Sequence, residues 1–178
     1  MAVLDEVGHL LQSLHGVWDE DGVDELDHAL QAAARARDDG ADDELVLAAA
    51  LHDLAHSPQF GAIAAQHHDR IAMEWLTPRL GDRVGWLAGA HVAAKRYLVA
   101  TDPDYATTLS DVSVDSLHHQ GGAYVDSALV DHRWWPDALR LRRYDDAAKV
   151  ARGDAASIDD VLLVAKRVLA LRSSRPAR

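Results

Sequence analysis

The pair His52-Asp53 is the feature of this 178-residue sequence that says most about chemistry. It lies near the end of a run of mostly Ala and Leu, the segment DDELVLAAALHDLAH over residues 42–56, which we predict to be a buried helix. Removing a carboxylate from water costs several kcal/mol unless a cation or hydrogen bonds compensate it, and a bound metal ion would do so. Neighbouring helical residues project about 100° apart. The aspartate must therefore reach sideways to share one metal with the histidine, or bridge two metals.

Further histidines and an aspartate occur in other segments with helical spacing. These are His28 in LDHALQ, His68 in HHDRIAMEWL, His91 in LAGAHVAAKRYL and Asp145 in RRYDDAAK. Each lies on its own predicted helix, so all of them could point into the interior of one bundle. Any one of them alone is more often a partly exposed side chain on an acidic helix. Together with His52-Asp53 they favour a metal site, and six candidate ligands favour two metals.

Composition limits what the site and its partners can be. There is no cysteine, which excludes disulfides, zinc-thiolate sites and iron–sulfur clusters and leaves histidine and carboxylate as metal ligands. The formal net charge of -11 argues against nucleic acid as a partner. No apolar run is long enough to span a membrane, and the N-terminus lacks the pattern of a signal peptide. We expect a cytoplasmic protein with no nucleic-acid or membrane partner.

The elements that must position these residues read as helices throughout. We predict long helices by their spacing, caps and stops over 25–40, 42–56, 62–81, 82–101, 135–150 and 158–171. The stretch from Asp104 to Asp131 predicts short helices and turns, and no segment alternates as a strand. The length suits one core. The sequence thus predicts a single all-α domain over residues 1–178, with a flexible tail over 172–178.

From His28 to Lys149 the chain resembles the HD-domain superfamily, which is named for its His…His-Asp…Asp ligand pattern. More narrowly, LDHALQ, ALHDLAH, HHDRIAMEWL, HVAAKRYL and LRRYDDAAK look like its phosphonate-cleaving branch, the diiron oxygenases related to myo-inositol oxygenase. The most specific string is HVAAKRYLVATDPDY, over residues 91–105. The resemblance implies an HD-domain helical bundle.

The resemblance also implies a reaction and a cofactor. An Fe(II)/Fe(III) pair would use O2 to cleave the C–P bond of a 1-hydroxyphosphonate similar to 2-amino-1-hydroxyethylphosphonate, releasing phosphate and a carboxylic acid. Carried over by position, one iron would be held by His28, His52 and Asp145, the other by His68 and His91, with Asp53 bridging. Asp146 competes with Asp145 for its role, and His67 competes with His68.

Other positions carry substrate roles by the same resemblance. Lys95 and Arg142 would bind phosphonate oxygens, although each could instead be a solvated surface cation. His56, one turn beyond His52, would hydrogen-bond the substrate or act in catalysis; its alternative is a charge interaction at a helix C-terminus. We expect five further histidines to face solvent: His9, His15, His118, His119 and His132.

Two positions depart from the family pattern. The enzymes that act on the aminohydroxyethyl substrate carry a Tyr ten residues before the first ligand and, seven before it, a Glu that recognises the amine. This chain has Trp18 and Asp21 there. Trp18 has no phenolic oxygen and is expected to pack in the core, whereas Asp21 keeps the negative charge on a shorter arm. The headgroup of the substrate therefore stays open.

Two other functions compete with the oxygenase. The same ligands could hold Mg, Mn, Ni, Co or Fe in a phosphohydrolase that activates water against a small phosphate ester or nucleotide. A binding domain that kept the fold without catalysis is the third reading, and it predicts that a ligand is missing.

Overall fold

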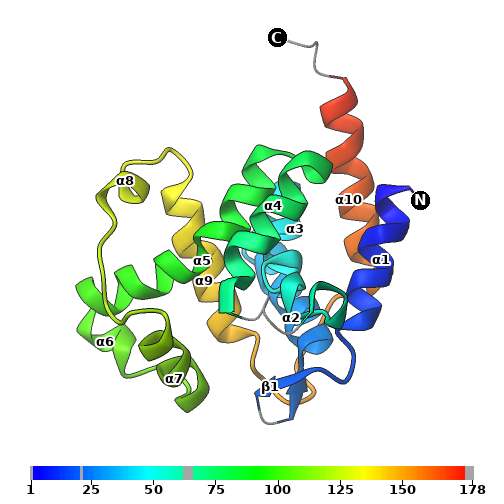
Figure 1. Ribbon diagram of the computed structural model, residues 1–178. Coiled ribbons are helices and arrows are strands. Elements are labelled where there is room, and N and C mark those ends of the chain that lie inside the picture. The colour runs from blue at the N-terminus through cyan, green and yellow to red at the C-terminus, as the bar shows by residue number, and fades with distance from the viewer. Residues whose placement is uncertain (1, 21, 62–65, 175–178) are drawn as a thin grey trace.

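Helices make up most of the computed structural model, which describes residues 2–20, 22–61 and 66–174 (Figure 1). The long helices are α1 (Val3–Ser13), α2 (Glu25–Asp38), α3 (Asp43–Leu51), α4 (His68–Leu80), α5 (Asp82–Thr101), α9 (Trp135–Ala147) and α10 (Ile158–Ser173). The short elements are η1 (Leu54–His56), η2 (Pro58–Phe60), α6 (Pro103–Ala106), α7 (Asp111–His119), α8 (Ser127–Val130) and an antiparallel pair, β1 (Trp18–Glu20) and β2 (Val23–Asp24). The predicted all-α class is confirmed.

Helix α3 forms the centre of the bundle. Every residue from Leu45 to Leu51 is buried, and the helix contacts α2, α5, α9 and α10. Its run Ala48-Ala49-Ala50 carries small side chains that let these neighbours approach closely. In Figure 1, α1 and α10 pack beside each other at one side of the bundle, and α6, α7 and α8 lie at the opposite side. The residues between α5 and α9 thus form the short helices that the sequence predicts.

Polar caps explain where several helices begin. The Asp24 and Asp42 side chains accept hydrogen bonds from the backbone N–H groups three residues later, at the starts of α2 and α3. Ser157 and Asp160 form the predicted reciprocal cap of α10. Gly40 adopts a φ of 69°, the left-handed conformation that glycine favours just beyond a helix. The predicted bounds of α5 agree with the structure, residue for residue.

The structure differs from the predicted elements in the following places. Helix 42–56 ends at Leu51, because the chain turns at His52-Asp53 before the short helix η1. Helix α4 begins only at His68; residues 62–65 of the predicted helix lie outside the described residues. Helix α1 was not predicted, and neither was the hairpin of β1 and β2, whose strands are too short to show alternation. No helix in the described part of the chain has the length and apolarity needed to cross a membrane.

Candidate metal centre

Five separate elements bring the six predicted ligands into one cluster. His28 comes from α2, His68 from the first turn of α4, His91 from the middle of α5 and Asp145 from the last turn of α9. His52 and Asp53 lie in the turn after α3. His52 is fully buried, and the other ligands are buried or nearly so. His52 keeps the helical backbone conformation of α3 and Asp53 departs from it, and both side chains reach the cluster.

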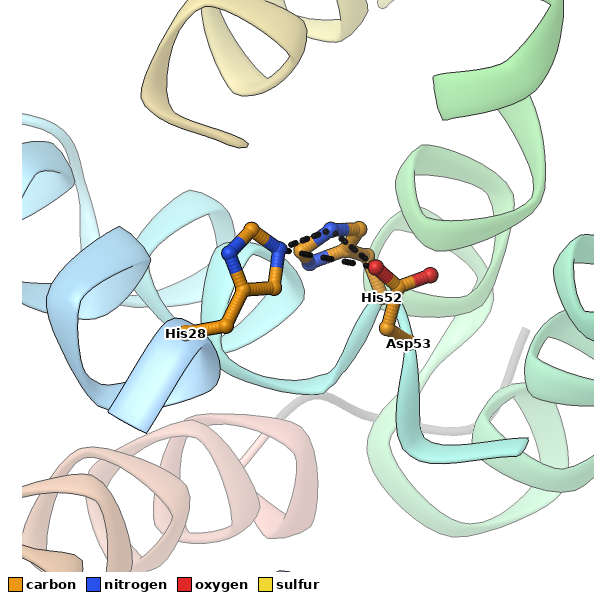
Figure 2. Close-up of side chains that lie close together, drawn as sticks. All are labelled: His28, His52 and Asp53. Atoms are coloured by element: carbon orange, nitrogen blue, oxygen red, sulfur yellow. Dashed lines mark hydrogen bonds and ion pairs between the residues drawn. The ribbon is translucent and has the colours of Figure 1, made fainter. Parts of the chain in front are cut away.

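One half of the cluster gathers around His52. Its Nε2 lies 2.9 Å from Asp53 Oδ2, 3.4 Å from His28 Nε2 and 3.5 Å from Asp145 Oδ2. His28 Nε2 lies 3.5 Å from the same Asp53 oxygen and 3.4 Å from Asp145 Oδ1. Figure 2 shows the His28 and His52 rings steeply inclined to each other, with the Asp53 carboxylate beside them. These donor atoms surround a single position between α2, α3 and α9.

The other half gathers around the second oxygen of Asp53. Oδ1 lies 3.4 Å from His91 Nε2, 3.5 Å from His68 Nε2 and 3.8 Å from His56 Nε2. The His68 and His91 nitrogens are themselves 3.0 Å apart. The two oxygens of Asp53 therefore face two different groups of imidazoles, which is the arrangement that a carboxylate bridging two cations requires.

The donor chemistry of the cluster fits metal ions. Asp53 Oδ1 is buried and, among the described residues, no hydrogen bond satisfies it, although three imidazole nitrogens stand near it. His52 Nδ1 lies 2.8 Å from the Ala49 carbonyl and His91 Nδ1 lies 2.6 Å from the Ala88 carbonyl, so each ring donates there and turns the lone pair of Nε2 inward. Nitrogen and carboxylate oxygen donors without thiolate suit zinc, iron and similar metals.

Electrostatics at the cluster also favour a cation. Burial alone would lower the pKa of His52, yet Asp53 and Asp145 raise it well above the usual value. Burial alone would raise the pKa of Asp145, but Arg142 and His52 hold it well below the usual range. The pKa of His91 lies well below the usual value, mainly because the ring is buried. Without a metal, the cluster thus holds a proton on His52 between the two carboxylates, and a metal ion bound there would displace that proton.

The structure separates each predicted ligand from its neighbouring competitor. Asp145 points into the cluster, whereas the Asp146 carboxylate accepts hydrogen bonds from Tyr105 and Arg142 outside it. His68 is buried against His91, whereas His67 is exposed. The geometry therefore favours Asp145 and His68 as the ligands.

A cavity of about 560 Å³ opens directly onto the cluster. Cluster residues form one wall, and the others include His56, Lys95, Arg142, Lys149 and the α7 residues Ser113, Ser116 and His119. Among the described residues no Phe, Tyr or Trp lines it. The space therefore offers ammonium, guanidinium, hydroxyl and imidazole groups beside the cluster, together with the carboxylates of Asp24 and Glu25.

Comparison with known proteins identifies the family, although no family model matches the chain. The chain is 36% identical over 141 residues to hydroxymethylphosphonate dioxygenase of Gimesia maris. The aligned region covers 74% of this chain and 70% of that protein. The chain is 30% identical over 161 residues to the glycine-betaine-forming [1-hydroxy-2-(trimethylamino)ethyl]phosphonate dioxygenase of Leisingera caerulea, with 81% and 82% covered. The chain belongs to the hydroxyphosphonate dioxygenase family. An uncharacterized protein of Acanthamoeba polyphaga mimivirus is also 30% identical, over 146 residues, with 76% and 67% covered.

In this member of the phosphonate dioxygenase family, two lysines at the cavity wall each donate to a serine hydroxyl of α7. Lys95 is buried, and its Nζ donates to Ser116 Oγ at 2.7 Å; burial, and then the charge of Arg142, lower its pKa to about 8. Lys149 Nζ donates to Ser113 Oγ at 2.7 Å. Both ammonium groups are thus held by hydroxyls of α7 at the cavity wall. No pattern in the sequence had pointed to these two serines.

The predictions for residues outside the cluster were confirmed only in part. Trp18 is 64% exposed, so the prediction that it packs in the core is wrong, and Asp21 lies outside the described residues. The predicted solvent-facing histidines are exposed, except His132. The His132 ring is half-buried and stacks on Trp86, with ring centroids 4.0 Å apart, because an aromatic cluster on α5 and before α9 gives it an apolar surface. Exposed His119 nevertheless lines the cavity.

Proposed function

We propose that this chain is a diiron oxygenase that uses O2 to cleave the C–P bond of a 1-hydroxyphosphonate. Two named relatives are dioxygenases of hydroxyphosphonates, which favours this reaction over hydrolysis of a phosphate ester. The observation that carries the proposal is Asp53, whose two oxygens face two separate groups of imidazoles beside an anion-sized cavity with two ammonium groups. A hydrolase could use one such metal group; a four-electron oxidation draws on both.

The proposed ligands divide between two iron ions. One is held by His28, His52 and Asp145, the other by His68 and His91, and Asp53 bridges them. The distances of 2.9–3.5 Å among donors of the first group, and of 3.0–3.5 Å among those of the second, support this division. A non-catalytic descendant of the family would be expected to lose a ligand, whereas all six stand together here.

The reaction balances with one molecule of oxygen. A hydroxyphosphonate dianion, R–CH(OH)–PO₃²⁻, and O2 give R–COO⁻, HPO₄²⁻ and one proton. The C–H and C–P bonds break, one oxygen atom joins carbon and the other joins phosphorus. The bound irons would supply the electron transfer and the activation of O2 that this change needs.

The residues of the chain contribute binding, orientation and proton placement. Lys95 and Lys149 bring two positive charges to the cavity wall, which offsets the cost of bringing a phosphonate dianion into a buried space. His56 Nε2 lies 3.8 Å from Asp53 Oδ1 and lines the cavity, so it is placed to hydrogen-bond the substrate beside the centre. The backbone carbonyls of Ala49 and Ala88 keep the His52 and His91 rings in the orientation that ligation requires.

One assay separates the candidate functions. Protein reconstituted anaerobically with iron and partly oxidised is given hydroxymethylphosphonate, 2-amino-1-hydroxyethylphosphonate, its trimethylated analogue and simple phosphate esters, each with and without O2. Phosphate release from a hydroxyphosphonate that depends on O2 supports the proposal, and the best substrate of the three identifies the headgroup. Release from an ester without O2 would instead establish a hydrolase, and metal binding without turnover would establish a non-catalytic protein.

A further inference from the structure

Each nitrogen of the Arg142 guanidinium donates to a protein group, although the side chain borders the cavity. Its Nη1 donates to Asp145 Oδ2 at 2.7 Å, and its Nε and Nη2 both donate to the Asp146 carboxylate. Such a two-pronged pairing fixes the plane of a guanidinium as well as its position. Arg142 is 3% exposed, so water does not compete for these bonds. Asp146 therefore determines how Arg142 presents Nη1 to Asp145.

Tyr105 locks the same pair from the other side. Its hydroxyl donates to Asp146 Oδ2 at 2.6 Å and accepts from Arg142 Nε at 3.0 Å. The Tyr105 side chain is buried and comes from α6, which packs against α5. The phenol thus connects Arg142 and Asp146 to an element outside α9. A pair bonded only within α9 could change conformation together, whereas the bonds to Tyr105 prevent this.

Arg142 affects the two oxygens of Asp145 differently. It donates a hydrogen bond to Oδ2, which also lies 3.5 Å from His52 Nε2, whereas Oδ1 lies 3.4 Å from His28 Nε2 and accepts no hydrogen bond from Arg142. A carboxylate held in this way offers one chosen oxygen to a cation, whereas an unrestrained carboxylate can rotate or bind through both.

We propose that Tyr105 and Asp146 are positioning residues, which act through Arg142 to orient the ligand Asp145. This inference rests on the proposed metal centre. It gives Arg142 a role at the ligand Asp145, in addition to the phosphonate contact that the resemblance to the family implies. Groups that orient metal ligands typically change metal affinity by about 10- to 100-fold when they are removed.

The chain contains a matched control for this arrangement. Tyr144 OH donates to the Asp39 carboxylate, and Arg140 donates to the same carboxylate at 2.8 Å. This second group uses the same kinds of bond, with Arg140 and Tyr144 on α9 and Asp39 just after α2, and none of its members lines the cavity. Tyr144→Phe and Asp39→Asn therefore remove equivalent hydrogen bonds without touching Asp145.

The experiment measures the affinity of each variant for Fe(II) by anaerobic competition with a chelator, with iron counted per chain. Tyr105→Phe and Asp146→Asn should weaken the binding of one of the two ions by about 10-fold or more, whereas Tyr144→Phe and Asp39→Asn leave both unchanged. Arg142→Lys keeps the positive charge but lacks the planar guanidinium with its parallel N–H donors, so this variant should bind the same iron ion more weakly. Melting temperatures of the metal-free variants show whether each pair is matched in stability.

Two failures can be told apart with these proteins. Equal iron affinities in Tyr105→Phe and Tyr144→Phe, or full affinity in Arg142→Lys, overturn the positioning role. Phosphate release by the wild-type protein without O2 overturns the proposed function and does not bear on iron affinity.

Discussion

The buried ammonium of Lys95 predicts a specific pH dependence of catalysis. Its pKa falls from the ordinary 10.5 to about 8, because burial and the charge of Arg142 disfavour the protonated form. A phosphonate dianion is bound by the protonated form, so binding is intact below this pKa and is lost as the pH rises through it. About half of the Lys95 side chains are protonated at pH 8 and about one tenth at pH 9. The expected loss in kcat/KM is therefore about tenfold per pH unit above pH 8.

Two substitutions convert this pH dependence into a test. Lys95→Arg keeps a cation that stays protonated beyond about pH 12, so the loss of kcat/KM above pH 8 should disappear. Lys95→Met removes a charge-assisted hydrogen bond worth ~1.5–3 kcal/mol, which lowers kcat/KM by about 10- to 150-fold at pH 7. Cations bound in the neighbouring centre shift the pKa further down, never up, because like charges disfavour the ammonium.

The assay is phosphate release from the best hydroxyphosphonate, measured between pH 6 and 10 with limiting substrate and saturating O2. Lys95→Arg is the control, because any decline in kcat/KM at high pH that this variant still shows must come from the titration of another group. A wild-type profile that stays level up to pH 10, or an identical decline in Lys95→Arg, would refute the role assigned to Lys95.

Three further predictions concern the centre and the core. Asp53→Ala should abolish binding of both iron ions, since each has this carboxylate as a ligand; metal analysis after reconstitution checks it, and two irons per chain would contradict it. A chelator should lower the melting temperature of the reconstituted protein and leave that of Asp53→Ala unchanged, because a metal stabilises only the state that binds it. Leu47→Ala should lower the free energy of unfolding by about 2–5 kcal/mol in urea titration, because Leu47 is fully buried in α3; a loss below about 1 kcal/mol would mean that the bundle closes over the gap.

Helix positions were the most predictable part of this chain, and their ends near the centre the least. The bounds of α5 follow from the Gly81-Asp82 start and the Pro103 stop, which act locally. The end of α3 could not be predicted in the same way, because the turn at His52-Asp53 serves contacts with α2, α5 and α9 that lie far away in the sequence. Spacing on one helix carries no information about such partners.

Part of the candidate site could be predicted because its residue types are unusual in their segments. His52 and His91 stand in runs of Ala, Leu and Val, where an imidazole needs a reason to be buried. Tyr105, Ser113 and Ser116 gave no such signal, because a tyrosine or serine is ordinary at the surface of a short helix. Their roles depend on how α6 and α7 fold back over α5 and α9, and only the structure shows this.

A local hydrogen bond of the same kind orients two of the proposed ligands. His52 donates from Nδ1 to the carbonyl of Ala49, and His91 donates to that of Ala88, in each case three residues earlier on the same segment. Each ring is therefore held in its rotamer and tautomer by its own turn of chain, without help from a neighbouring helix. Metal binding therefore restricts the rotation of these two rings very little. The conformational entropy that a flexible side chain loses when it binds a metal is lost here already, when α3 and α5 form.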